Sequence, residues 1–208
     1  MLGFEVAQST VSRYMTRPSR PPSQSWKTFL QNHAEAIAAI DMCVVPTLAF
    51  ERLFAFLVLG HGRQLLWFEV TRHPTADWLA RQITEAFPWA SAPAYLVRDN
   101  DRAYGHVFTS RVRVMGIRDR PISHGSPWQN GIAERFIGTL RRECLDHMAI
   151  FNEEHLRRIL ASYAACYNQA RTHLALQKDA PLRRPARRFG RITAIPVLAG
   201  LHHQYVRI

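Results

Sequence analysis

Three apolar segments joined by short turns stand ahead of an alternation of helical and strand-like segments, and this order constrains the fold more than any other feature. The segments at 39–46, 50–60 and 63–71 are apolar and partly aromatic or β-branched, which favours strands. Glycines at positions 60 and 62 suit a hairpin turn between the second segment and the third. The three segments therefore predict an antiparallel meander.

The rest of the chain alternates between two kinds of pattern. Short apolar runs at 94–97 and 116–122 predict two more strands, the second one at a sheet edge. A strand that follows a helix in this way indicates a parallel crossover. We therefore predict an α/β fold in which a mixed five-stranded sheet is flanked by helices. The helices are expected from apolar spacing at 74–87, 105–116, 126–144 and 152–170.

Composition divides the chain into three parts. Residues 1–25 contain one short helix-like stretch and then a Pro- and Ser-rich run that is typical of a linker. Residues 26–182 have the size and the apolar content of one globular domain. Residues 183–208 form a tail with six arginines and no acidic residue. The end of this tail has short β-like runs that suggest a hairpin, docked on the core or on a partner.

The charge balance points to nucleic acid. The chain has 27 Lys and Arg residues against 16 Asp and Glu residues, a net charge of +11. Such an excess of positive charge favours binding to phosphates, because condensed counterions are released. We expect the tail arginines to contact the DNA backbone. The three cysteines form no C-x-x-C pair, which favours reduced core thiols. With neither a signal peptide nor a membrane span in the pattern, we expect a cytoplasmic protein without membrane contact.

Three acidic residues occupy informative places in this scheme. Asp41 interrupts an apolar strand, and Asp99 follows the end of another. Glu134 lies at the rim of the apolar face of a predicted helix. A charge inside a buried strand is costly unless it is paired or binds a cation. Three carboxylates from separate elements suit Mg²⁺, which prefers oxygen ligands, and two such ions can catalyse phosphoryl transfer.

Spacing alone leaves another interpretation of Glu134 open. Arg141 is its near neighbour on the same helix face, so the pair can be an ordinary surface ion pair. In addition, sixteen acidic residues make some arrangement of three carboxylates easy to find. The pattern of acids is therefore consistent with a metal site without being specific for one.

Four motifs resemble the integrase core domain of bacterial insertion-sequence transposases, a family related to retroviral integrases. The resemblance covers roughly residues 26–182, and the third motif is the most specific of the four. It implies an RNase H-like fold and a D-D-E triad that binds two Mg²⁺ or Mn²⁺ ions. The motifs are DMCVVPT, YLVRDNDRAYG, SPWQNGIAERFIGTLRRECLDH and YNQARTHLAL.

Matched motif by motif, the triad is Asp41, Asp99 and Glu134. The last two are 35 positions apart, close to the usual spacing of the family. Asp101 competes with Asp99, but Asp99 matches the position of the family better. Asn130 and Gly131 match the Asn-Gly that precedes the Glu in the family, which implies that they shape the backbone and contact substrate beside the metals. Phosphate contacts are then expected from Arg135, Arg141 and Arg142, with a solvated helix face as the open alternative for each. The tail adds Arg183, Arg184, Arg187 and Arg188.

The implied function is DNA integration or transposition. Metal-activated water cleaves the 3′ end of the element, and the freed 3′-hydroxyl then attacks target DNA. Residues 1–25 resemble only the last helix of the helix-turn-helix region that usually precedes the core, so we expect an N-terminally truncated transposase. Two alternatives remain open, a non-catalytic DNA-binding remnant and a nuclease of the same fold. The partners implied are element-end DNA, target DNA and further copies of the chain on DNA.

Overall fold

The computed structural model describes residues 25–88, 91–183 and 189–208. The chain divides into two compact units, Met1–Asn32 and His33–Ile208. In the first unit, helix α2 (Trp26–Asn32) begins after Ser25, whose hydroxyl accepts a hydrogen bond from the Thr28 amide at 3.2 Å. The short helix that the sequence predicts near the N-terminus lies outside the described residues. None of the described helices is both long and apolar enough to cross a membrane.

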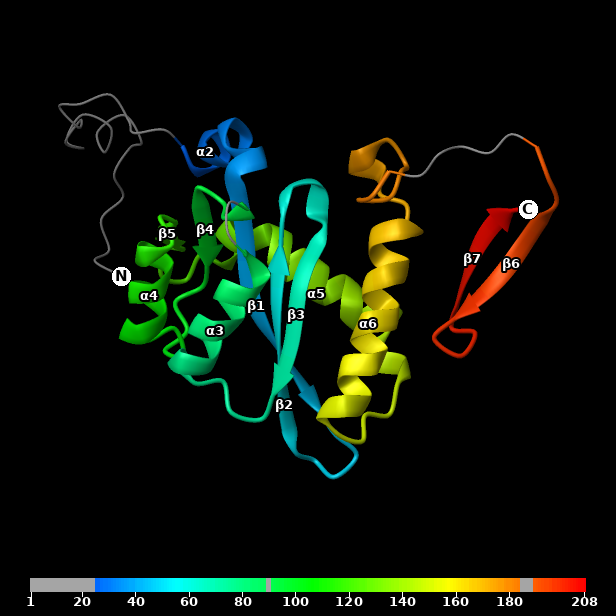
Figure 1. Ribbon diagram of the computed structural model, residues 1–208, viewed down its shortest axis with the longest axis horizontal. Helices are drawn as coiled ribbons and strands as arrows, with labels where there is room; N and C mark the ends of the chain where they lie inside the picture. The colour runs from blue at the N-terminus through cyan, green and yellow to red at the C-terminus, as the bar shows by residue number, and fades with distance from the viewer. Residues whose placement is uncertain (1–24, 89–90, 184–188) are drawn as a thin grey trace, which may run out of the picture. The chain divides into compact units, whose positions relative to one another are not determined.

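The second unit is built on a mixed five-stranded sheet in the order β3-β2-β1-β4-β5 (Figure 1). The first three strands pair antiparallel, and β4 and β5 are added in parallel orientation. The predicted meander and the predicted mixed sheet flanked by helices are both confirmed. The strands are β1 (Ile37–Pro46), β2 (Arg52–Leu59), β3 (Leu65–Thr71), β4 (Tyr95–Arg98) and β5 (Arg118–Pro121).

The conformation of the turn between β2 and β3 accounts for the glycine at position 62. Residues His61–Arg63 form a short 3-10 turn, and Gly62 has a φ of 68°. This left-handed conformation carries little steric cost for glycine, whereas a residue with a Cβ atom adopts it less readily. The tight turn returns the chain to pair β3 with β2, which produces the hairpin that the sequence predicts.

Four helices cover the two faces of this sheet (Figure 1). Ile40 and Phe56 point to one face, where they pack with α3 and α4. Leu57 points to the other face, where it packs with Phe136 of α5 and Tyr163 of α6. Both faces of the central strands are therefore buried, which accounts for their nearly continuous apolar sequences. The helices are α3 (Ala76–Ala86), α4 (His106–Val114), α5 (Gly131–Glu143) and α6 (Glu153–Gln169).

Side chains at the starts of two helices supply hydrogen-bond acceptors for backbone amides. Thr75 caps α3 by accepting a hydrogen bond from the Trp78 amide at 3.2 Å. Asn152 caps α6 by accepting one from the His155 amide at 2.8 Å. Such caps satisfy amides that have no partner inside the helix.

A two-stranded hairpin ends the chain. Strands β6 (Ile192–Val197) and β7 (His202–Arg207) pair antiparallel. The hairpin tip contacts the core, where His202 Nε2 donates a hydrogen bond to the backbone oxygen of Glu143 at 2.6 Å and Leu198 packs against the core side chains. The β-like runs of the tail therefore form the suggested hairpin, and it docks on this chain.

Glu143 connects three segments at the end of α5. Its carboxylate accepts hydrogen bonds from Arg171 at 2.6 Å and 2.8 Å, and from the Tyr163 hydroxyl at 3.0 Å. Burial raises the pKa of this carboxyl, but the Arg171 guanidinium outweighs burial and holds the pKa below its ordinary value. The ionised form of Glu143 therefore stabilises the junction of α5, α6 and the segment after α6.

Replacing Leu140 tests the packing of α5. Leu140 is fully buried between the sheet and α6, so Leu140→Ala should lower the free energy of unfolding by about 2–5 kcal/mol. Ile132→Ala, on the same helix but 41% exposed, is the matched control and should cost less than about 1 kcal/mol. Urea denaturation followed by circular dichroism measures both. Equal losses would contradict the placement of α5.

Replacing Glu143 tests its ion pair through pH. Because the folded-state pKa lies below the unfolded value, the stabilisation is present above the unfolded pKa and is lost as the pH falls through the folded pKa. Glu143→Gln should lower the free energy of unfolding by about 1–3 kcal/mol near pH 7, and this loss should shrink near pH 3. Urea unfolding at both pH values measures it.

Glu51→Gln supplies the control for Glu143. Glu51 pairs with Arg72, and both side chains are nearly half exposed. Exposed pairs of this kind contribute about 0–1 kcal/mol. A loss for Glu143→Gln that is no larger than the loss for Glu51→Gln would show that the Glu143 junction does not stabilise the fold.

Candidate active site

The parallel pairing of β1 with β4 aligns the first two predicted site residues. Ala39 of β1 lies opposite Val97 of β4. Asp41 is two residues beyond Ala39, and Asp99 is two residues beyond Val97. Since side chains two residues apart point to the same face of a strand, both aspartates are directed toward the face that α5 covers.

Asp41 is held inside the sheet at a high electrostatic cost. It is 7% exposed; one carboxylate oxygen accepts a hydrogen bond from the Met42 amide at 2.8 Å, and the other lies 3.4 Å from Asn130 Nδ2. The pKa of Asp41 is raised to about 7, chiefly by burial and in addition by the nearby carboxylates of Asp99, Glu134 and Asp101. Asp41 therefore interacts electrostatically with both other acids of the predicted triad.

Asp99 follows directly after the last residue of β4. Its Oδ1 atom is buried and has no hydrogen-bond partner among the described residues. Burial raises the pKa of Asp99, and the charge of Asp101 adds to that rise, while the Arg98 guanidinium opposes it. A buried carboxylate oxygen without a donor is unfavourable, so this position favours an additional positive or donating group.

Arg98 fixes the backbone beside Asp99, a role that sequence patterns hardly indicate. Its guanidinium donates to Asp119 at 2.9 Å and 2.7 Å and to the backbone oxygen of Asp99 at 2.9 Å. It also lies over the ring of Tyr104, 5.1 Å from the centroid. An arginine at the end of an otherwise apolar strand was the available signal. Its partners Asp119 and Tyr104 could not be identified from spacing.

Glu134 lies in the first turn of α5 and is exposed. The start of α5 is tied to β1 because Asn130 Nδ2 donates to the backbone oxygen of Ile40 at 3.0 Å. Arg141 donates to the backbone oxygen of Val44 at 3.0 Å, and no ion pair within the described residues includes Glu134. The surface pair that spacing allowed between Glu134 and Arg141 is therefore not formed.

The donor set fits a hard cation, although the acids do not form a complete metal cage. Among the described residues, no group of three or more His, Cys, Asp or Glu side chains could hold a metal ion. Mg²⁺ is usually bound through one or two carboxylates, with water and substrate phosphates completing its shell. The unpaired Asp99 oxygen and the raised pKa values of Asp41 and Asp99 are consistent with such partial coordination.

The predicted DNA-contacting residues lie in different environments. Asn130 is 2% exposed and serves to position α5, with its Oδ1 buried and unpartnered among the described residues. A Cβ atom added to Gly131 would meet no atom within 4 Å. Arg141 is half-buried, and three other arginines are exposed, namely Arg135, Arg142 and Arg183. Arg184, Arg187 and Arg188 lie outside the described residues.

Comparison with known proteins identifies relatives among insertion elements. Residues 115–181 match the family model of the integrase core domain. The chain is 31% identical over 165 residues to an uncharacterized 31.7 kDa protein of insertion element IS407 from Burkholderia multivorans, covering 77% of this chain and 54% of that protein. It is 25% identical over 168 residues to a 39.2 kDa protein of IS476 from Xanthomonas euvesicatoria, covering 78% and 44%. The chain thus spans about half the length of these relatives.

Solved structures share the fold at low sequence identity. A chain of the simian T-cell lymphotropic virus intasome matches with a TM-score of 0.56 and 15% identity, covering 83% of this chain and 66% of that one. The catalytic domain of Mos1 mariner transposase matches with a TM-score of 0.57 and 9% identity, covering 67% and 77%. These likenesses confirm the predicted RNase H-like fold. In sequence, this chain is similar to the integrase core domain over residues 115–181 and to proteins of insertion elements over about three quarters of its length.

Proposed function

We propose that this chain is the catalytic part of a D-D-E transposase, which cleaves 3′ ends of element DNA and joins them to target DNA. The observation that carries the proposal is the alignment of Asp41 and Asp99 on neighbouring parallel strands, with Glu134 on a helix tied to the same strand. Similarity to the integrase core domain and to insertion-element proteins supports DNA transposition in general. The specific chemistry follows from these carboxylates.

In this proposal Asp41, Asp99 and Glu134 hold two Mg²⁺ or Mn²⁺ ions. When bound, such ions supply Lewis-acid chemistry to both the attacking and the leaving oxygen of a phosphodiester. One structure of the Mos1 transposase catalytic domain with Raltegravir contains Mn, and another contains Mg. The shared fold and the acidic donor set support the same choice of cations here.

The residues around the triad position it. The hydrogen bond from Asn130 to the Ile40 carbonyl holds the first turn of α5, and with it Glu134, against β1. The hydrogen bond from Arg98 to the Asp99 carbonyl holds the end of β4. Since misplacement of a reacting group by about 1 Å can cost a hundredfold in rate, these backbone contacts matter for catalysis. No side chain is required as a covalent nucleophile, because water and then the 3′-hydroxyl attack the phosphorus.

DNA binding in this proposal uses exposed arginines. Arg135 and Arg142 of α5 and Arg183 after α6 are exposed and can reach phosphates. Residues 26–182 then form the catalytic core, and the Arg-rich part, 183–208, adds backbone contacts. We further propose that several copies act together on DNA in the cytoplasm. A non-catalytic DNA-binding remnant is the alternative, and strand breakage distinguishes the two.

Substitution of the triad tests catalysis. Asp41→Asn, Asp99→Asn and Glu134→Gln should each lower Mn²⁺-dependent cleavage by at least about a hundredfold, because each removes a ligand charge worth several kcal/mol in the transition state. The substrate is a duplex carrying the DNA that flanks the gene at each end of its element, and products are resolved on denaturing gels.

Asp101→Asn is the matched control for this experiment. It removes a carboxylate that lies two positions from Asp99 and also raises the pKa of Asp41. The control therefore separates the loss of a carboxylate at a triad position from the loss of a nearby negative charge. It should retain most of the activity. Full activity in Glu134→Gln would refute the assigned triad, and salt-dependent binding without strand breakage by the wild type would favour the non-catalytic remnant.

Metal binding can be tested without catalysis. A ligand at a hundred times its Kd stabilises the folded state by about 2.7 kcal/mol, so saturating Mn²⁺ should raise the melting temperature of the wild type. The increase should be smaller in Asp99→Asn, because the native Asp99 carboxylate has a buried oxygen without a partner among the described residues. In Asp77→Asn, which replaces an exposed residue of α3, the increase should equal that of the wild type. Differential scanning fluorimetry measures this. An identical rise in all three proteins would exclude Asp99 as a ligand.

A further inference from the structure

The outermost strand of the sheet sorts its charges between two faces. Along β5, Arg118 lies opposite Tyr95, and Arg120 lies opposite Val97. Since partners in neighbouring strands share a face, both arginines are on the face toward which Asp41 and Asp99 are directed. Asp119 points to the other face, where Arg98 pairs with it at 2.7 Å. The only acid of β5 is thus neutralised on the far face, while both arginines lie on the face of the proposed site.

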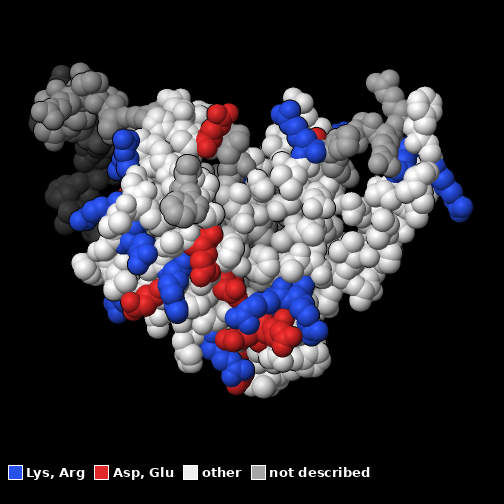
Figure 2. Space-filling model, viewed as in Figure 1, with Lys and Arg blue, Asp and Glu red and all other residues white. Residues whose placement is uncertain are grey.

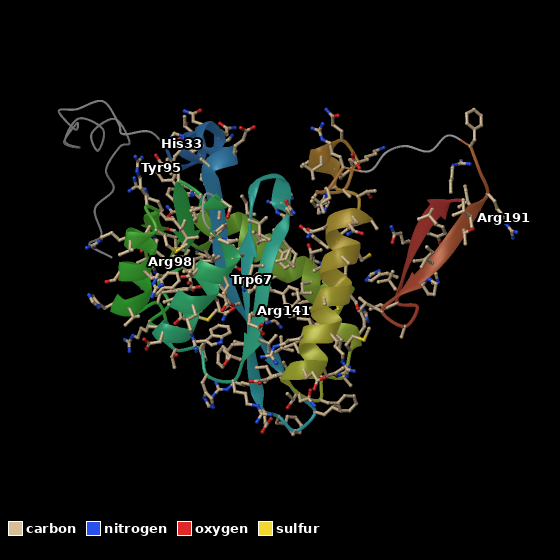
Figure 3. The ribbon with its side chains drawn as sticks, viewed as in Figure 1. His33, Trp67, Tyr95, Arg98, Arg141 and Arg191 are labelled. Atoms are coloured by element: carbon tan, nitrogen blue, oxygen red, sulfur yellow. The ribbon has the colours of Figure 1, made fainter. Side chains whose placement is uncertain are left out.

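Tyr95 organises these two arginines. Arg118 donates to the Tyr95 hydroxyl at 2.7 Å, and its guanidinium carbon lies 5.2 Å from the ring centroid. The Arg120 guanidinium lies 5.6 Å from the same centroid. The His33 ring stacks on Tyr95 at 5.0 Å with an interplanar angle of 29° (Figure 3). Tyr95 is only 9% exposed, whereas both arginines are exposed.

A purely structural role would account for part of this arrangement. Arginine stems can cover an apolar ring while their charged ends stay in water, and cation–π contacts stabilise such positions. That role does not require two arginines on the same face of an edge strand beside a cluster of acids. An anion bound to both arginines would use the positive charge that they place on this face.

The position of the pair relative to the acids suggests the anion. Arg120 is level with Val97, two residues before Asp99. At about 3.3 Å per residue and about 4.8 Å between strands, its Cα lies roughly 8 Å from that of Asp99. Arg118 is two residues farther along. DNA places one phosphate per about 3.4 Å of rise on each strand, so the pair is within a few nucleotides of a phosphodiester held at the acids.

The main helix contacts on this face lie away from β5. Helix α5 packs on β1 and β2, and α6 packs on β3. Arg118 and Arg120 are exposed on the β4–β5 side of the same face. Figure 2 shows Lys and Arg side chains over the end of the molecule that carries α4, which packs on the other face of the sheet. A polyanion that reaches the acids over β5 would pass Arg118 and Arg120.

We propose that Arg118 and Arg120, organised by Tyr95, bind the phosphate backbone of DNA, so that the strand leading to the acids crosses the β5 edge of the sheet. This inference rests on the proposed function, which supplies DNA as the substrate. It adds a contact surface that is separate from α5 and from the Arg-rich tail.

The experiment measures binding of a short fluorescent DNA duplex by anisotropy, with EDTA present so that no metal contributes. Arg118→Gln/Arg120→Gln should raise Kd by about tenfold or more and reduce the slope of log K against log salt by about 2, because each phosphate contact contributes about 0.9 to that slope. The series covers about 50–200 mM salt. Circular dichroism confirms that the variant is folded.

The matched control removes the same charge from the other layer. Arg111 and Arg113 are exposed on α4, which packs on the opposite face of the sheet. Arg111→Gln/Arg113→Gln should change Kd by less than about threefold, since only the net charge of the protein differs. Equal effects of the two double variants would overturn the proposal, because position would then be irrelevant.

Tyr95→Phe provides a second variant with no change in charge. It removes the hydroxyl that holds Arg118 but keeps the ring, so Kd should rise by about twofold to fivefold. If the wild type binds DNA and Arg118→Gln/Arg120→Gln binds it with the same Kd, this inference is overturned and the catalytic proposal is not affected. Binding by the wild type without any metal-dependent strand breakage would overturn the catalytic proposal alone, and absence of DNA binding by the wild type would overturn both.

Discussion

The parallel pairing of β1 with β4 is the contact on which the rest of the site depends. It sets Asp41 and Asp99 at the same level on one face of the sheet. Asn130 then attaches the start of α5 to the same strand through the Ile40 carbonyl, which brings Glu134 to that face. A slip of one residue in either strand would turn one aspartate to the opposite face. The apolar residues that alternate with the acids, such as Ile40 and Leu96, prevent such a slip because they fill the α3–α4 layer.

This arrangement is stabilised by its surroundings and is not favourable in itself. Asp41 is buried in a strand, where ionisation is costly, and Asp99 and Asn130 each have a buried oxygen without a partner among the described residues. The Arg98 network offsets part of this cost on the far side of β4, since its guanidinium satisfies Asp119 and the Asp99 backbone together. Unsatisfied polar atoms persist where function requires them and the rest of the fold supplies the stability.

Sequence patterns predicted the elements well because each depends on local periodicity. The strands β1 to β5 and the helices α3 to α6 all lie where apolar spacing placed them, and Asp41 was identified because a charge in an apolar strand stands out. The partner of Arg141 could not be predicted, since a helical wheel does not show which strand passes beneath α5. The Arg98–Asp119 pair joins residues 21 positions apart, and only the parallel pairing of β4 with β5 brings them together.

The helices on the face of the acids pack mainly on one side of the sheet. Helix α5 packs on β1 and β2 and α6 packs on β3, while β4 and β5 lie on the other side of β1. A strand with alternating charges can keep its acid on one face and its arginines on the other only if its register with β4 is fixed. The same pairing that orients Asp99 therefore orients Arg118 and Arg120. In this way one strand register couples the proposed chemistry to the surface that would bind the DNA.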